Sequence, residues 1–363
     1  MLKIAEIPAN ASRLFKTYEE AKIQPLGKLE LDIHPNGHHV FNKSFDKSKI
    51  HYDLNYNTEN TFHFQQTLEY FSGLSKFLTK FSRFCEIGCG QGEFVEYLRS
   101  NGFNAFGYDP VLKESKKYLF NIEWSLGEEE NLKSETVMNN TLYIMRCVLP
   151  HISDPFKFLD DIFEKYPDSA ILIEFQNKEW IEKKKLWSQI SHDHVNIFSK
   201  RDFENRYTIL NSGDFSNYEW TYVLLQRKIQ SFSYSGEGAH LSKLLKMEEI
   251  FETRKKEISL LQATDRPILI FGAAGKGIVS GFTLINEGVN VIYAIDSNIK
   301  HQGKYMECSG IRVITETEIK AKLSSKTIVL IANPNHMQYV SRIFAGKFTL
   351  AIMGKITQKE LNL

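Results

Sequence analysis

One order of elements occurs twice in this sequence, and it restricts the possible folds more than any other feature. The first copy starts with an apolar run at 84–87 and continues through a glycine-rich turn at 88–92. A helical pattern at 93–100 and a second apolar run at 105–108 follow, and Asp109 comes next. Strand, glycine loop, helix, strand and acid in that order form a βαβ unit, in which the helix connects two parallel strands.

The second copy lies near the end of the chain. It predicts a strand at 268–271, a turn at 272–277, a helix at 278–287 and a strand at 291–295 that precedes Asp296. The two copies share a plan without obvious sequence identity. We therefore expect an α/β protein with two tandem Rossmann-like, doubly wound domains and a small irregular or β-rich N-terminal lobe.

The 363 residues are enough for two or three domains at roughly 150 residues each. Residues 1–60 are rich in Asn, His, Pro and Lys and predict the small lobe. Residues 61–262 contain the first βαβ unit, with helices expected at 61–78 and 241–261. Residues 263–363 contain the second unit, so we expect three domains with these bounds.

Composition excludes several classes of function. Lys and Arg number 45 against 44 Asp and Glu, so no overall basic field attracts nucleic acid or anionic membrane. No signal-peptide core and no run of about 18 apolar residues occurs, so we expect a cytoplasmic protein without a membrane partner. Nothing in the sequence predicts the oligomeric state. The cysteines are too scattered for a disulfide scaffold or an all-thiolate zinc site, and they are Cys85, Cys89, Cys147 and Cys308.

The first glycine loop has an unusual spacing, Glu86-x-Gly88-x-Gly90-x-Gly92, which differs from the dinucleotide fingerprint G-x-G-x-x-G. Glycines let the backbone turn sharply and approach a ligand closely. Asp109 follows at the roughly 20-residue spacing of an acid that binds ribose hydroxyls. The implied ligand is a nucleoside with a bulky group other than phosphate.

This loop, with Gly107-Tyr108-Asp109-Pro110, resembles the first two motifs of class I S-adenosylmethionine methyltransferases. Residues 145–155 resemble the segment after the fourth strand of these enzymes, where His151 matches and Pro150 replaces the usual Glu. The resemblance implies S-adenosylmethionine as cofactor. The residues expected to bind it are Glu86, Gly88, Cys89, Gly90, Gly92, Asp109 and Arg146.

A later stretch narrows the resemblance. Glu174-Phe175-Gln176-Asn177 and Ser191-His192-Asp193-His194 are similar to the E-x-P-N and Y-H-E-H segments of the sugar C-methyltransferase family. Members of that family also carry a second Rossmann-like domain, and the match extends over roughly residues 28 to 350. The resemblance implies methyl transfer to carbon 3 of a nucleotide-linked 4-keto-6-deoxysugar.

The chemistry of that reaction gives the histidines a role. A ring carbon becomes nucleophilic after it loses a proton and its charge spreads into the neighbouring ketone as an enolate. Imidazole is the usual base near neutral pH. By resemblance, His194 is the base and Asp193 orients it, and the expected catalytic set is completed by His192 and Ser191.

Three departures from the family pattern matter. Ser191 replaces a tyrosine, so the enolate needs a hydrogen bond from Ser191, His192 or elsewhere. Gln176 replaces a proline. The cysteines of the family's N-terminal zinc lobe are absent, and we expect that lobe to fold without zinc, its histidines His34, His38 and His39 lying in a polar loop. We expect no metal in the protein, although His192 and His194 would share a face on a strand and with Asp193 could bind one.

The second glycine loop fits neither a P-loop nor a dinucleotide fingerprint. By resemblance, its domain encloses the nucleotide end of the substrate, with Lys276 or Lys304 available for the diphosphate. The residues expected to bind substrate are Asn177, Asn196, Lys276, Lys304 and Asn333. Three alternatives stay open: an O- or N-methyltransferase, a non-catalytic nucleotide-sugar or S-adenosylmethionine binding protein, and a nicotinamide-dependent oxidoreductase.

Overall fold

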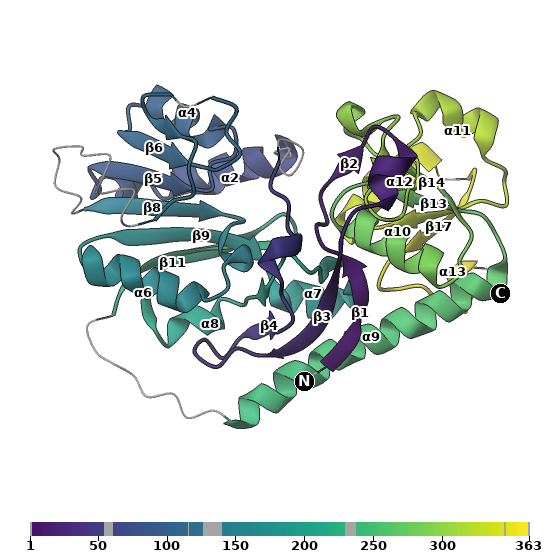
Figure 1. The fold of residues 1–363 in the computed structure, drawn as a ribbon, viewed down its shortest axis with the longest axis horizontal. Coiled ribbons are helices and arrows are strands. Elements are labelled where there is room, and N and C mark those ends of the chain that lie inside the picture. The colour runs from purple at the N-terminus through teal and green to yellow at the C-terminus, as the bar shows by residue number, and fades with distance from the viewer. Residues whose placement is uncertain are drawn as a thin grey trace.

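The computed structural model of the chain describes residues 2–53, 61–114, 116–125, 140–228, 237–344 and 346–361. Two sheets flanked by helices stand side by side, and a four-stranded antiparallel sheet lies next to both of them (Figure 1). The expected α/β class with two Rossmann-like sheets is confirmed. Among the described helices, none is long and apolar enough to cross a bilayer.

The larger sheet has seven strands in the order β11-β12-β9-β8-β5-β6-β7. All neighbours from β9 to β7 are parallel, and β12 is antiparallel to both β9 and β11. Its strands are β5 (Arg83–Ile87), β6 (Ala105–Tyr108), β7 (Leu119–Phe120), β8 (Thr141–Arg146), β9 (Ala170–Gln176), β11 (Tyr207–Phe215) and β12 (Trp220–Arg227).

Both faces of this sheet are covered because most side chains of its central strands are apolar. Leu142 and Ile144 belong to the core cluster with α2 and α4, while Tyr143 and Met145 belong to the cluster with α6 and α8. Alternate residues of one strand thus face opposite layers, as a doubly wound sheet requires. The flanking helices are α2 (Thr61–Gly73), α3 (Ser75–Leu78), α4 (Glu93–Ser100), α6 (Pro155–Lys165), α7 (Lys178–Lys184) and α8 (Arg201–Glu204).

The C-terminal sheet is wholly parallel, in the order β14-β13-β16-β17. The 28-residue helix α9 (Glu237–Thr264) runs below the molecule and connects the two parts of the chain (Figure 1). The strands are β13 (Ile268–Phe271), β14 (Val291–Ile295), β16 (Ile328–Ile331) and β17 (Thr349–Ile352). The helices are α10 (Lys276–Asn286), α11 (Glu316–Lys322), α12 (Met337–Phe344) and α13 (Gln358–Leu361).

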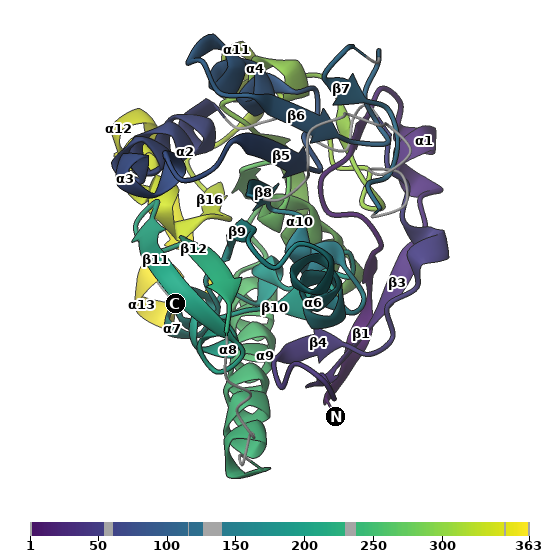
Figure 2. The ribbon, with the colours of Figure 1, turned by 90° about the vertical axis from the view of Figure 1, so that its left-hand side faces the viewer.

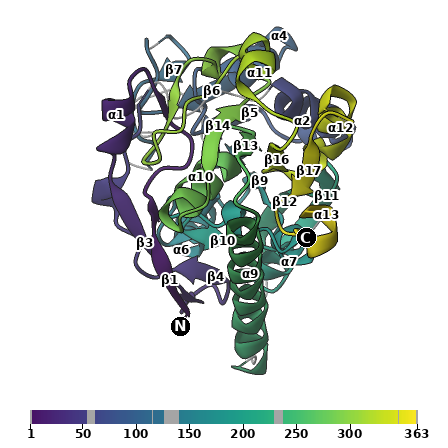
Figure 3. The same ribbon diagram turned by 90° about the vertical axis from the view of Figure 1, so that its right-hand side faces the viewer.

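The N-terminal segment pairs with both of these parts. It forms β1 (Leu2–Pro8), β2 (Leu14–Phe15), α1 (Tyr18–Lys22), β3 (Leu26–Ile33) and β4 (Val40–Asn42). β10 (Asn196–Ile197) completes its antiparallel sheet, which Figure 2 shows beside α6, and β2 pairs with β15 (Tyr305–Met306). Helix α10 also packs against β1, and the two lie next to each other in Figure 3. The lobe therefore buries its apolar side chains against the rest of the chain.

Two expectations need correction. The helix expected at 61–78 is divided into α2 and α3. His34 and His39 are buried rather than exposed in a polar loop: their rings stack 4.9 Å apart, and His39 Nε2 lies 2.7 Å from Asn196 Oδ1. Burial lowers the pKa of His39 to about 4, so this imidazole is neutral at pH 7 and serves as a packing and hydrogen-bonding residue.

Candidate active site

The first glycine loop leaves the carboxyl end of β5, between β6 and β8. The chain adds β6 and β7 on one side of β5 and β8 on the other, which makes this edge the switch point where open α/β sheets bind ligands. Gly88 has φ +73° there, and a Cβ on it would lie 2.4 Å from Cγ2 of Val148 in the loop after β8. Glycine is required at this position because the two loops touch.

Asp109, at the carboxyl end of β6, fastens this loop. Its Oδ2 accepts a hydrogen bond from Gly90 N at 2.8 Å, and its Oδ1 accepts one from Val111 N at 2.9 Å. Burial raises its pKa, and these two N–H donors counteract the rise. A carboxylate has about four acceptor positions, so two remain for the hydroxyls of a ribose.

The second unit repeats this arrangement. Asp296 follows β14, and its Oδ2 accepts a hydrogen bond from Ala273 N of the second loop at 2.7 Å. Its Oδ1 lies 3.3 Å from His301 Nδ1. In both βαβ units, therefore, the aspartate that follows the second strand, Asp109 or Asp296, holds the glycine loop that follows the first strand.

Two other residues expected to bind cofactor are paired with each other. Arg146, the last residue of β8, donates from Nε to Glu86 Oε1 over 2.7 Å, and both side chains are buried. Cys89 is buried against Gly107, and burial raises the pKa of its thiol. These three side chains are buried and support the loop.

The expected base lies in a second group of side chains. His194 is partly buried, its ring centroid is 4.8 Å from that of His151, and the ligand atoms of these two histidines and Asp193 lie within 4.8 Å of one another. Burial lowers the pKa of His194 to about 4, while Asp193 raises it and His151 and Lys276 lower it further. His194 is therefore neutral at pH 7 and able to accept a proton.

Asp193 is held in place by its own bonds. Its Oδ1 accepts a hydrogen bond from Ser191 Oγ at 2.6 Å, and its Oδ2 accepts one from Ala11 N at 3.4 Å. The backbone oxygen of Asp193 lies 2.7 Å from His151 Nδ1. The hydroxyl of Ser191 is thus committed to the carboxylate of Asp193.

His192 and Asn196 point elsewhere. The chain at 191–195 is irregular, not a strand, so His192 and His194 do not share a face as the metal alternative required. His192 turns to the N-terminal lobe, where Nδ1 lies 2.8 Å from Lys28 O and Nε2 accepts a hydrogen bond from Asp46 N at 3.2 Å. Asn196 donates to Ile152 O over 2.7 Å. Both side chains hold segments of the fold together.

Two residues that sequence reasoning missed belong to the same region. Burial and the carboxylates of Asp193, Glu123 and Asp109 raise the pKa of Tyr52, although 40% of this residue is exposed. Burial and then Asp193 raise the pKa of Glu307 to about 8, against the lowering effect of Arg13. Neither lies in a recognisable motif, so no signal in the sequence marks them.

The C-terminal sheet meets the larger sheet through four polar residues, which we call the latch: Glu219, Lys276, Asn333 and Asn335. Glu219 lies in the turn between β11 and β12 and is 4% exposed. It accepts hydrogen bonds from Lys276 Nζ at 2.6 Å, Asn333 Nδ2 at 3.0 Å and Asn335 Nδ2 at 2.9 Å. Although burial opposes it, Lys276 and Asn333 lower the pKa of Glu219.

The latch changes the interpretation of two expected substrate-binding residues. Lys276 and Asn333, which follow the carboxyl ends of β13 and β16, are bonded to the carboxylate of Glu219. A diphosphate was the expected partner of this region. The other expected lysine, Lys304, is half-buried in the turn before β15.

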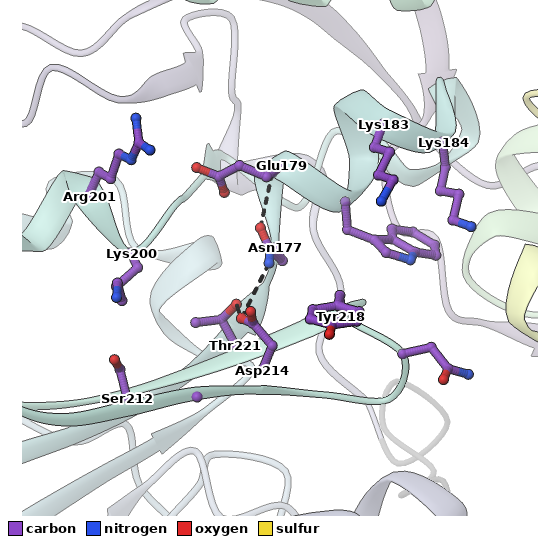
Figure 4. Close-up of a pocket in the computed structure, with 13 residues that line it drawn as sticks. Asn177, Glu179, Lys183, Lys184, Lys200, Arg201, Ser212, Asp214, Tyr218 and Thr221 are labelled. Carbon is purple, nitrogen blue, oxygen red and sulfur yellow. Dashed lines mark hydrogen bonds between the residues drawn. The ribbon is translucent and has the colours of Figure 1, made fainter.

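Asn177 lines a cavity of about 560 Å³ between α7 and the β11–β12 hairpin. It accepts a hydrogen bond from Glu179 N at 3.0 Å, which begins α7, and donates to Asp214 over 3.3 Å. Figure 4 shows the basic side chains around this cavity, and they are Lys183, Lys184, Lys200 and Arg201. Trp180 also lines it, and its ring centroid lies 5.8 Å from Lys276 Nζ, so the cavity adjoins the latch.

With this geometry in view, the comparisons identify the class of the central part of the chain. Residues 61–208 match a family model described as a methyltransferase domain. The matched residues include the glycine loop, Asp109, His151 and His194. These residues therefore form a methyltransferase domain, and S-adenosylmethionine is its methyl donor.

No curated protein matches the sequence. Among solved structures, magnesium protoporphyrin IX methyltransferase from Synechocystis PCC 6803 with bound SAH aligns at 14% identity, 47% of this chain, 90% of that chain and a TM-score of 0.34. A SAM-dependent methyltransferase from Archaeoglobus fulgidus aligns at 16% identity, 53% of this chain, 92% of that chain and a TM-score of 0.29. Likenesses this low carry no information on the acceptor.

Replacing Asp109 with alanine is expected to weaken binding of S-adenosylmethionine at least about tenfold. The variant loses the hydrogen bonds that the ribose hydroxyls would donate to a charged carboxylate, at roughly 1.5 to 3 kcal/mol. Calorimetric titration measures the affinity, and circular dichroism checks the fold. The matched control is Asp296→Ala, which removes the equivalent loop contact in the C-terminal sheet. Unchanged affinity in a folded Asp109→Ala variant would exclude the residue from the donor site.

Proposed function

We propose that the enzyme transfers a methyl group from S-adenosylmethionine to carbon 3 of a nucleotide-linked 4-keto-deoxysugar through an enolate. The observation that carries this proposal is the neutral His194 beside Asp193, in the region where the two parts of the chain meet. An O- or N-methyltransferase has no need to remove a proton from carbon, whereas this acceptor cannot react without it.

His194 would remove the proton on carbon 3, and the electron pair of that C–H bond would move into the neighbouring carbonyl to form the enolate. Asp193 raises the pKa of His194 and so favours the imidazolium that results. S-adenosylmethionine, when bound, supplies an electrophilic methyl group on a positive sulfur. The new carbon–carbon bond forms as the carbon–sulfur bond breaks, and His194 later releases its proton to water.

The enolate oxygen needs a hydrogen-bond donor, and we assign this role to Tyr52. Ser191 stands at the position of the family's tyrosine, but its hydroxyl donates to Asp193 Oδ1. His192 faces the N-terminal lobe. The carboxylates of Asp193 and Asp109 contribute to the raised pKa of Tyr52, and a phenol is protonated and able to donate at neutral pH.

We assign the diphosphate of the acceptor to the cavity that Asn177 lines. Its four basic side chains outnumber the two acids there, Glu179 and Asp214. Arginine and lysine are the usual partners of phosphate oxygens. Lys276 and Asn333 are bonded to Glu219 and would bind the substrate only in place of that carboxylate, and Lys304 remains a candidate for the diphosphate.

Exchange of the carbon-bound proton tests this proposal. Wild-type enzyme is incubated in heavy water with a nucleotide-linked 4-keto-6-deoxysugar and no methyl donor, and the proton on carbon 3 is followed by NMR. We expect its signal to disappear faster than in the enzyme-free sample. A protein that methylates an acceptor at oxygen or nitrogen and shows no such exchange contradicts the assignment.

A further inference from the structure

A second cluster of side chains lies at the carboxyl edge of the larger sheet, away from His194. His63 comes from the first turn of α2, Cys147 directly follows β8, and Glu174 lies in β9. One ligand atom from each residue lies within 4.8 Å of the other two. His63 Nε2 is 3.2 Å from Glu174 Oε2 and 4.0 Å from Cys147 Sγ.

The same nitrogen of His63 faces both partners. A relay in which histidine passes a proton between a thiol and a carboxylate uses its two ring nitrogens, one for each partner. Here Nε2 carries at most one proton, and that proton cannot point to Glu174 Oε2 and to Cys147 Sγ at the same time. A single cation between the three atoms fits instead, because metal–ligand distances of about 2.0 to 2.3 Å place pairs of ligands about 3 to 4 Å apart.

The carboxylate of this cluster is oriented from behind. Glu174 is fully buried, and its second oxygen, Oε1, accepts hydrogen bonds from Thr67 Oγ1 at 3.0 Å and from the hydroxyl of Tyr70. His63, Thr67 and Tyr70 recur at helical spacing on α2, so one helix face provides a ligand and both supports. Ligands of bound metals are characteristically fixed by such hydrogen bonds.

The backbone at Cys147 fits this picture. Cys147 has φ +59°, a left-handed conformation that is costly for a residue with a Cβ. Its N–H donates to the backbone oxygen of Glu174 over 3.1 Å. The hydrogen bond to β9 thus holds the thiol of Cys147 next to the carboxylate of Glu174. The strained backbone at Cys147 is maintained by the structure around it.

We propose that His63, Cys147 and Glu174 bind one divalent ion of the zinc class. Imidazole, thiolate and carboxylate together suit zinc and do not suit Mg²⁺ or Ca²⁺, which prefer oxygen. Three protein ligands leave a fourth position for water or for an oxygen of a bound molecule. The site adjoins the first glycine loop, because Val148, next to Cys147, contacts Gly88. This revises the expectation of a protein without metal.

Elemental analysis of protein purified without chelator or affinity tag tests the proposal. We expect about one zinc per chain in wild type and a loss of most of it in Cys147→Ser and in His63→Ala. The matched controls are Cys308→Ser, a buried cysteine elsewhere, and His151→Ala, which disrupts the other three-residue cluster. Both controls should retain the metal.

A second measurement does not depend on the folding of a variant. Wild type is stripped with chelator and reloaded with Co²⁺, and a thiolate-to-cobalt charge-transfer band is expected in its absorption spectrum. Wild type that takes up neither ion contains a buried His63–Glu174 ion pair instead, and the proposal is wrong. Metal that survives in folded Cys147→Ser overturns it equally. Neither readout requires methyl transfer, so failure here is separate from failure of the proposed function.

Discussion

Replacing His194 with alanine is expected to abolish proton exchange at carbon 3 and to lower methyl transfer about 10²- to 10⁴-fold, the usual contribution of a general base. Binding of S-adenosylmethionine should survive, because no hydrogen bond among the described residues joins His194 to the first glycine loop or to Asp109. NMR in heavy water measures the exchange, and a methyl-transfer assay measures the rate.

The neighbouring histidine provides a matched control. His192→Gln keeps polar atoms at a position that contacts the N-terminal lobe. We expect this variant to be less stable than wild type but to exchange the proton at the wild-type rate per folded molecule. Exchange that persists in His194→Ala, or that disappears in folded His192→Gln alone, would show that the base is misassigned.

The pH dependence follows from the low pKa of His194. The base must be neutral, and with a pKa of about 4 it stays neutral down to a lower pH than an ordinary histidine at about 6.5. The acid limb of the exchange rate should therefore lie below pH 6. Replacing Asp193 with asparagine removes the group that raises this pKa, and the limb should move to still lower pH as the base weakens.

The second large effect is expected at the latch. Lys276→Met leaves the carboxylate of Glu219 buried without a countercharge, which typically costs about 3 to 5 kcal/mol of stability. Both side chains are well shielded: 11% of the Lys276 side chain and 5% of the Glu219 side chain are exposed. Urea denaturation measures the loss, and limited proteolysis shows whether the C-terminal sheet separates first.

Two further variants complete this experiment. Adding Glu219→Gln to Lys276→Met removes the unpaired charge and should recover part of the stability. Lys304→Met, the control, should have little effect because Lys304 is not part of the latch. If Lys276→Met is as stable as wild type and loses affinity for a nucleotide sugar, Lys276 is a substrate ligand and the latch has little energetic weight.

Local sequence was sufficient for the larger elements of the fold. Short, mostly apolar runs bounded by glycine turns predict buried strands, and the two βαβ units appear where the pattern predicts them. Element ends were less certain. Lys276 and Gly277, expected in the turn, already lie in α10, because a strand-to-helix turn and the first helical residues look alike in sequence.

Contacts between distant segments could not be predicted from the sequence. Glu219 lies in a turn without a motif, and nothing local indicates that it will meet Lys276 and two asparagines across the molecule. The N-terminal strands gave no sign that β10 and β15 would complete their pairing. Such pairings depend on how whole layers pack, and this is decided by tertiary contacts.

The sequence by itself determined the glycine loop and Asp109, because backbone conformation at glycine and an acid after the next strand are local properties of the chain. Tertiary structure alone decided where the histidines lie. His192 and His194 are two residues apart, yet an irregular backbone turns one to the N-terminal lobe and leaves the other beside Asp193. His63, Cys147 and Glu174 come together because a helix and two strand ends meet at one edge of the sheet, which no spacing along the chain could express.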